Sequence, residues 1–225
     1  MTLETAKQRK TPTGSNPATA RQQRTPAPAQ KAGRRRGSVT KELIMSIASA
    51  LFREKGYDRT SLEDIAAGLS ITKPSLYYHF SSKEDILLEC LSSGYIYFQR
   101  KIAETDDPRL PGRDRVRIFM EAYVDLLQDT VLSMVVADER VMSDAGKAKS
   151  RNYKRMLNRD LLDRIEIGCK DGSLRAQDPR IVAFGIFGMI NWMTHWQAGA
   201  LDMSPEAVTE QFVSLVLDGI STGQR

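Results

Sequence analysis

The stretch TSLEDIAAGLSITKPSLYYHF, residues 60–80, predicts two short helices joined by a tight turn. Thr60 and Glu63 have the spacing of a capping box, which predicts that the first helix starts at Ser61. Gly68 stands where that helix is expected to end and the chain must turn. The segment therefore has the organisation of a helix-turn-helix unit.

The second of these helices is expected to present a polar and aromatic face to solvent. Thr72 is its predicted cap, and Pro74 is tolerated because the first helical turn has no intrahelical N–H partner to lose. Leu76 and Phe80 lie four residues apart and are expected to face inward. The residues left on the outer side are Lys73, Ser75, Tyr77, Tyr78 and His79.

This outer face is better suited to nucleic acid than to plain solvent. Hydroxyls, an ammonium and an imidazole near a helix N-terminus can bind phosphates and base edges. No acidic residue occurs between Thr72 and Lys83. The alternative is a solvated surface whose aromatic rings pack partly on neighbouring residues.

Residues 39–91 resemble the DNA-binding domain of the TetR family of bacterial one-component repressors. The resemblance is carried by the patterns AxxLFxxxGY at residues 48–57 and LYYHFxxKE at residues 76–84. Two positions depart from the family pattern, because Ser70 stands where glycine is usual and Pro74 replaces a small residue.

The resemblance implies contacts with double-stranded DNA at an inverted-repeat operator. The positions that match backbone contacts of the family are Thr60, Thr72, Tyr77, His79 and Lys83, and those that match base contacts are Lys73, Pro74 and Ser75. We add Ser61 and Tyr78 to the predicted DNA-binding residues.

Residues 1–37 are predicted to be a disordered basic tail. They hold nine basic residues against one acid, a net charge of +8, which leaves residues 38–225 at −3 of the chain's +5. The tail has almost no large apolar residue to bury. We expect Arg34, Arg35 and Arg36 to lie along phosphates or enter a minor groove. The alternative is a solubilising extension or an uncleaved leader. No apolar segment follows the tail, so a secretory signal is not expected.

The remaining sequence predicts an all-α fold of about nine helices. We expect a DNA-binding domain at residues 38–97, with three helices, and a larger ligand-binding and dimerisation domain at residues 98–225. The periodicity of three and four is helical, and no alternating strand pattern occurs. A further capping box is expected at Ser81 and Glu84. The long helices are expected at residues 82–102, 115–130, 131–142 and 151–169.

Residues 181–193 are apolar almost throughout, with Asn191 their one polar residue and two interposed glycines. Thirteen residues are too few to span a bilayer, so no membrane segment is expected. Such a helix must be covered on all sides. We expect it to form, with the helix that follows residue 204, the four-helix interface of a homodimer, as the family resemblance implies. The alternative is a monomer core.

The larger domain is expected to bind a small hydrophobic effector. Aromatic and methionine side chains with a few polar groups line apolar ligand pockets, although ordinary cores have the same composition. The final segment of the chain resembles the subgroup of the family that senses acyl-coenzyme A thioesters in fatty-acid and sterol catabolism, which implies an acyl-CoA effector. The predicted ligand-binding residues are Tyr95, Phe98, Phe119, Tyr123, Met134, Met156, Trp192 and His195.

Little in the sequence suggests catalysis. The chain has two histidines, two cysteines, no glycine-rich phosphate loop and no spacing typical of a metal site, so we expect no enzyme activity, no metal and no cofactor. Cys90 and Cys169 are expected to be reduced, as in the cytoplasm. A second hypothesis is an architectural, ligand-independent DNA-binding protein whose affinity comes mainly from the tail.

Overall fold

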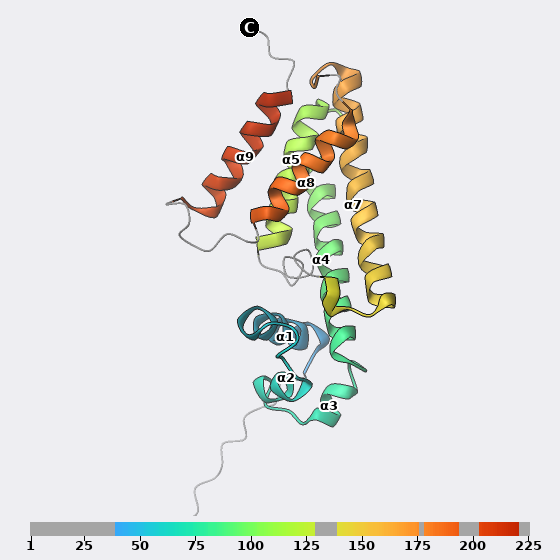
Figure 1. Cartoon of the computed structure of the whole chain (residues 1–225), viewed down its shortest axis with the longest axis vertical. Helices are drawn as coiled ribbons and strands as arrows, with labels where there is room; N and C mark the ends of the chain where they lie inside the picture. Colours follow the sequence, from blue (N-terminus) through green and yellow to red (C-terminus); the bar gives the residue numbers. More distant parts are fainter. Residues whose placement is uncertain (1–38, 129–138, 176–177, 194–202, 221–225) are drawn as a thin grey trace, which may run out of the picture. The chain divides into compact units, whose positions relative to one another are not determined.

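The computed structural model describes residues 39–128, 139–175, 178–193 and 203–220 (Figure 1). The chain divides into Met1–Gly37 and Ser38–Arg225, and every described residue belongs to the second unit. The described residues form α-helices and one 3-10 turn and contain no strand, so the predicted all-α fold is confirmed. The elements are α1 (Lys41–Lys55), α2 (Leu62–Gly68), α3 (Lys73–Tyr77), α4 (Lys83–Thr105), α5 (Gly112–Gln128), η1 (Glu139–Val141), α7 (Asp144–Asp171), α8 (Pro179–Met193) and α9 (Pro205–Ile220).

The first predicted capping box is wrong by one residue. The cap of α2 is Ser61, whose hydroxyl accepts the Asp64 N–H at 3.1 Å while the Asp64 carboxylate accepts the Ser61 N–H at 2.9 Å. Thr60 is only 1% exposed, and its hydroxyl donates to the Gly56 carbonyl at 2.8 Å. Two adjacent hydroxyl residues offered the same pattern, and burial of Thr60 decides between them.

The second predicted box is shifted in the same way. Ser82 caps α4 by accepting the Asp85 N–H at 3.0 Å, and Ser81 donates its own N–H to the Asp85 carboxylate at 3.2 Å. Glu84 instead accepts the N–H of Ser143, the cap of α7, at 2.9 Å and the Ser143 hydroxyl at 2.7 Å. The beginnings of α4 and α7 are therefore hydrogen-bonded to each other.

The three short helices and the first turns of α4 share one core. α1 packs on α2 and α4, and α2 packs on α3. The turn between α2 and α3 requires a left-handed residue, which is Ser70 at a φ of 56°. α3 ends at Tyr77 rather than continuing to Phe80, so the predicted two-turn helix is too long. The buried residues of this core are Ile44, Ala48, Phe52, Ile65, Ala66, Leu76, Phe80, Ile86, Leu87 and Leu91.

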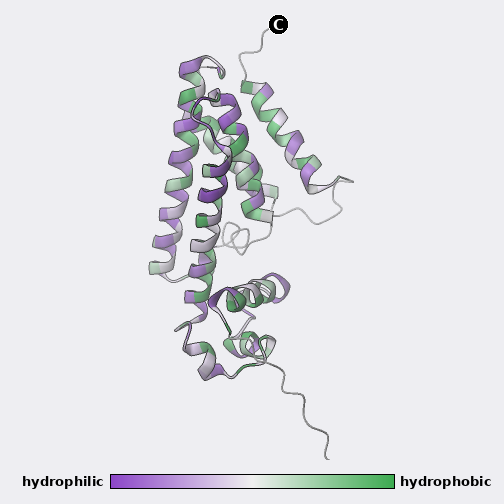
Figure 2. Cartoon of the chain, turned by 180° about the vertical axis from the view of Figure 1, so that it is seen from behind, coloured by the Kyte–Doolittle hydropathy of each residue, from purple (hydrophilic) through white to green (hydrophobic). Residues whose placement is uncertain are grey.

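In the second half of the chain, α4, α5 and α7 pack against one another, α8 packs on α5 and α7, and α9 packs on α5 (Figure 1). Figure 2 shows purple hydrophilic bands along α7 that alternate with green hydrophobic ones, and the buried residues of α7 include Leu157, Leu161 and Ile165. α5 and α7 cross very closely, because a Cβ on Gly112 would overlap the Gly168 backbone. The predicted helix at residues 131–142 lies largely outside the described residues, and its last part, Glu139–Val141, is the 3-10 turn.

A buried ion-pair cluster joins the end of α4 to α5 and α7. Asp106 receives two hydrogen bonds from Arg115, at 2.7 and 2.8 Å, and one from Arg164 at 2.8 Å. Hydrogen bonding to Arg115 holds the pKa of Asp106 below its usual value.

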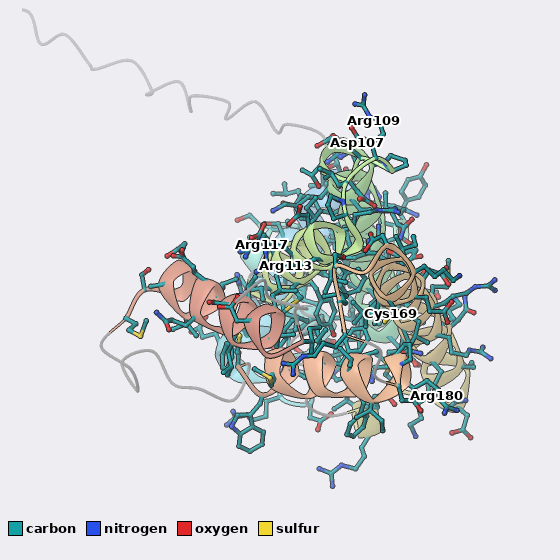
Figure 3. The ribbon with its side chains drawn as sticks, turned by 90° about the horizontal axis from the view of Figure 1, so that it is seen from above. Asp107, Arg109, Arg113, Arg117, Cys169 and Arg180 are labelled. Atoms are coloured by element: carbon teal, nitrogen blue, oxygen red, sulfur yellow. The ribbon has the colours of Figure 1, made fainter. Side chains whose placement is uncertain are left out.

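Seen from above in Figure 3, Arg113 lies between α5 and α9, where it donates to Asp218 at 3.1 Å, whereas Arg109 points away from the helices.

Candidate nucleic-acid interface

The structure mounts α3 on the core with its aromatic face outward. Leu76 and Phe80 are buried beneath it, whereas Tyr78 is 87% exposed and Tyr77 is 48% exposed. Ser75 is exposed as well. α3 can therefore bring hydroxyl groups to a surface outside the molecule without exposing its core.

A cation at the start of α3 is held by an acid from α2. The Lys73 ammonium forms an ion pair with the Glu63 carboxylate, and it lies 5.7 Å from the centroid of the Tyr77 ring. The hydrogen bond from Lys73 lowers the pKa of Glu63. Both side chains are exposed, so a phosphate or base edge could replace Glu63 as the partner of Lys73.

The other predicted DNA-binding residues lie at or near the ends of α2 and α3. The Thr72 hydroxyl caps α3 and lies 3.0 Å from the Ser75 hydroxyl. Pro74 is exposed in the first turn. His79 is half-buried and packs edge-on against the Tyr78 ring, with their centroids 5.2 Å apart. Ser61 is half-buried and occupied as the cap of α2.

Two side chains that were predicted to contact DNA form hydrogen bonds within the protein. Thr60 is buried, and its hydroxyl is hydrogen-bonded to the carbonyls of Leu51 in α1 and of Gly56. The Lys83 ammonium donates to the carbonyls of Tyr57 at 2.7 Å and Thr60 at 2.9 Å, and it lies 4.2 Å from the centroid of the Tyr57 ring. Lys83 therefore ties α4 to the loop between α1 and α2.

The first turn of α1 lies close to the residues that follow α3, a contact that was not predicted. Its cap is Thr40, and the ammonium of the exposed Lys41 lies 5.3 Å from the centroid of the Phe80 ring, just after α3. The only sequence signal was a hydroxyl residue before an amphipathic segment. Arg34, Arg35 and Arg36 lie outside the described residues.

Part of the predicted ligand-binding set forms an aromatic core between α4, α5 and α8. Phe98, Phe119 and Tyr123 are buried, and Phe187, which the sequence analysis missed, completes the cluster with centroid distances of 6.1 Å to Phe119 and 5.1 Å to Tyr123. The Tyr123 hydroxyl donates to Asn191 at 2.8 Å, and burial raises the pKa of Tyr123. This pair supplies a polar group within the aromatic core.

The rest of that set lies elsewhere. The Tyr95 ring packs at a tilt against the Tyr153 ring, with centroids 5.1 Å apart, at the edge of the core. Met156 and Trp192 are exposed rather than part of the core, because they occupy the outward faces of α7 and α8. Met134 and His195 lie outside the described residues.

Among the described helices, none is long and apolar enough to cross a membrane. The same residues contain no group of three or more His, Cys, Asp or Glu side chains that could hold a metal ion.

Comparison with known proteins identifies the family to which this chain belongs. The family model described as bacterial regulatory proteins, tetR family, matches residues 44–90, and that described as tetracyclin repressor-like, C-terminal domain, matches residues 109–220. The chain belongs to the TetR family of bacterial regulatory proteins. Its first three helices with the start of α4 are the family's helix-turn-helix domain.

Relatives in this family match nearly end to end. The HTH-type transcriptional repressor KstR2 of Rhodococcus jostii (strain RHA1) is 29% identical over 214 residues, which is 88% of this chain and 98% of that protein. A TetR/AcrR regulator of Thermobifida fusca is 26% identical with a TM-score of 0.66, over 80% of this chain and 97% of its own. AibR, solved with isovaleryl coenzyme A and operator DNA, has a TM-score of 0.69 over 78% of this chain and 96% of its own, and its 22% identity shows the fold alone.

The backbone conformation at Ser70 shows why the family usually has glycine at this position. The family usually has glycine at the position of Ser70, and Ser70 has the left-handed backbone that glycine adopts without strain. This TetR-family chain therefore keeps the turn geometry with a residue that is strained there.

Proposed function

We propose that this chain is a cytoplasmic, ligand-responsive transcriptional repressor that binds inverted-repeat operator DNA as a homodimer and catalyses no reaction. The observation that carries the proposal is the exposed face of α3, with Lys73, Tyr77 and Tyr78, above the buried Leu76. The relatives named as KstR2 repressors support it.

Dimerisation is supported by an uncovered apolar stripe on α8. Ile181, Phe184 and Trp192 are exposed, Phe184 to 79%, and a Cβ on Gly185 would meet no atom within 4 Å. Leu215 of α9 is also exposed. A contiguous apolar surface of this kind marks an interaction site, and a symmetric dimer covers it with its own copy. Phe184→Lys should give a monomer in sedimentation equilibrium. A dimer of unchanged affinity would place the interface elsewhere.

An acyl-CoA thioester is the proposed effector. The aromatic cluster of Phe98, Phe119, Tyr123 and Phe187 is the apolar region against which the acyl chain would pack, with the Tyr123–Asn191 pair as its polar group. Solved relatives include AibR with isovaleryl coenzyme A and a ketosteroid regulator, KstR2 of Mycobacterium tuberculosis. A thermal-shift screen tests the effector, since a ligand that binds the native state raises Tm. A shift with cationic drugs and none with any acyl-CoA would reject it.

Two structural connections can couple effector binding in the second half of the chain to operator binding in the first half. α4 contributes Leu87 to the core around α1 and Phe98 to the aromatic cluster. At its first turn, Glu84 accepts both hydrogen bonds from Ser143 at the start of α7. Ligand and operator should then weaken each other's binding by the same factor, about 5–150-fold. Ser143→Ala should reduce that factor while leaving operator binding without ligand intact.

The decisive experiment is footprinting of the purified protein on the DNA upstream of its own gene. Lys73→Ala and Tyr77→Ala should abolish the specific footprint. Tyr97→Ala is the matched control, because Tyr97 is 45% exposed, close to the 48% of Tyr77, and lies on α4. Deleting residues 1–36 should weaken binding to all sequences alike and flatten its salt dependence. If the α3 variants keep the footprint and only the deletion removes binding, the architectural hypothesis is correct.

A further inference from the structure

The first half of α7 carries a concentration of positive charge that the DNA-binding face does not use. Residues 145–159 contain six lysines and arginines and no acid, although residues 38–225 together have a net charge of −3. We call the exposed part of this set the basic ridge. It consists of Lys149, Arg151, Lys154, Arg155 and Arg159.

Most of the ridge is not neutralised by the protein. Lys154 pairs with Glu139 at 2.6 Å, and the field of Arg151 also lowers the pKa of that carboxyl. Within the described residues, Lys149, Arg155 and Arg159 form no ion pair. Like charges on one helix face repel, so an anion that binds here gains energy from several cations at once.

The ridge borders two hollows rather than a flat surface. The larger, of about 790 Å³, lies between α7 on one side and, on the other, α4 with the segment that joins α3 to α4, and the smaller is a shallow depression lined by α7 alone. Ala148 and Arg155 line both, so the hollows adjoin. The volume of the larger hollow is that of a small-molecule site.

The lining of the larger hollow combines cations with neutral hydrogen-bonding groups. Lys149 and Arg155 stand on one side with the Asn152 amide between them, and His79 and Ser81 stand on the other. Two acids also line it, Asp85 and Glu89, and Asp85 already accepts the N–H and the hydroxyl of Ser81. Cations and amides together suit phosphate groups and the edge of a base.

An aromatic pair connects this hollow to the proposed effector core. Tyr153 lines the hollow and packs at a tilt against Tyr95, which contacts the buried core that includes Phe98 and Phe119. A molecule with a phosphorylated head and an apolar tail could thus contact both regions.

We propose that the hollow between α7 and the α3–α4 segment binds the phosphates of a nucleotide, either as a free nucleoside polyphosphate or as the nucleotide end of a coenzyme A thioester. The second form rests on the proposed effector, and the first does not. Because His79 and Ser81 directly follow α3, a nucleotide bound in the hollow would contact both the end of the helix-turn-helix unit and α7. The walls on two sides favour a small anion over the backbone of a DNA duplex.

Isothermal titration of the full-length protein tests the proposal, with ADP, ATP, free coenzyme A and a short acyl-CoA as probes. The variant is Lys149→Gln/Arg155→Gln. The matched control is Arg100→Gln/Lys170→Gln, which removes two exposed cations outside the hollow. The variant should lose about tenfold or more in affinity for the bound probe, and the control should lose none. Equal binding of ADP and coenzyme A identifies the free nucleotide, and tighter binding of coenzyme A identifies the thioester end.

Three results would overturn the proposal: no probe binds the wild-type protein, the variant binds as tightly as the wild type, or the control loses as much affinity as the variant. Circular dichroism and Tm establish that the variant is folded. Footprinting runs in parallel. If the ridge variant keeps its probes but reduces the salt slope of operator binding by about one or more per protomer, the ridge binds DNA instead. If the wild-type protein gives a footprint on the operator but binds none of the nucleotide probes, the nucleotide site is rejected and the proposed repressor function is unaffected.

Discussion

Lys83 offers the sharpest test, because sequence and structure assign it different roles. We expect Lys83→Met, which keeps the apolar stem, to lower stability without changing the ionic part of DNA binding. The variant loses hydrogen bonds of 2.7 and 2.9 Å to two carbonyls and a cation–π contact of 4.2 Å. Hydrogen bonds from a charged group contribute about 1.5–3 kcal/mol. Burial lowers the pKa of Lys83, so desolvation offsets part of this energy, and we expect a loss of about 1–2 kcal/mol.

The assay combines calorimetry with a salt titration of operator binding. A loss of that size lowers Tm by about 2–8 °C for a chain of this length. The slope of log affinity against log salt should stay at the wild-type value. Lys73→Met is the matched control, because its ammonium is on the surface, and it should lower the slope by about one per protomer with little change in Tm. If Lys83→Met behaves like the control, with Tm unchanged and a smaller slope, the assignment of Lys83 to the loop carbonyls is wrong.

Three further variants test single features of the structure. Ser70→Gly should raise stability in urea titrations by up to about 1 kcal/mol, since it relieves a left-handed residue at some cost in unfolded-chain entropy; a lower stability would mean that the serine side chain is needed. Gly168→Ala should lower stability by about 1–3 kcal/mol, because its Cβ would lie 2.5 Å from Leu174, whereas a Cβ on Gly219 meets nothing within 4 Å, so Gly219→Ala should be neutral in the same titrations. Glu63→Gln should tighten operator binding about two- to five-fold in gel-shift titrations by releasing Lys73, and weaker binding would show that Glu63 positions it.

Local patterns located the helices of the DNA-binding domain but not all of their ends. Thr60 and Ser61 each match an N-cap with an acid three residues on, and so do Ser81 and Ser82. In both pairs the second residue is the cap. For Thr60 the reason is non-local, because its hydroxyl is buried against carbonyls of the preceding helix and loop.

Contacts between distant residues were beyond prediction for a related reason. Glu63 and Lys73 are ten residues apart, on two helices whose crossing sets the distance between their side chains. Phe187 joins Phe119 only because α8 packs on α5. The apolar segment around Phe184 was recognised by composition, but its exposed side was not, since hydropathy does not say which face of a helix a neighbour covers.

The sequence by itself determined the all-α class, the helix-turn-helix unit and the outward aromatic face of α3, because capping, periodicity and turn residues act over a few positions. The tertiary structure decided that Thr60 is buried, that the Lys83 ammonium binds carbonyls of the loop between α1 and α2, that Glu63 neutralises Lys73, and that the α7 cations border a hollow. Those outcomes depend on how separate helices pack, and packing places side chains together that no local pattern relates.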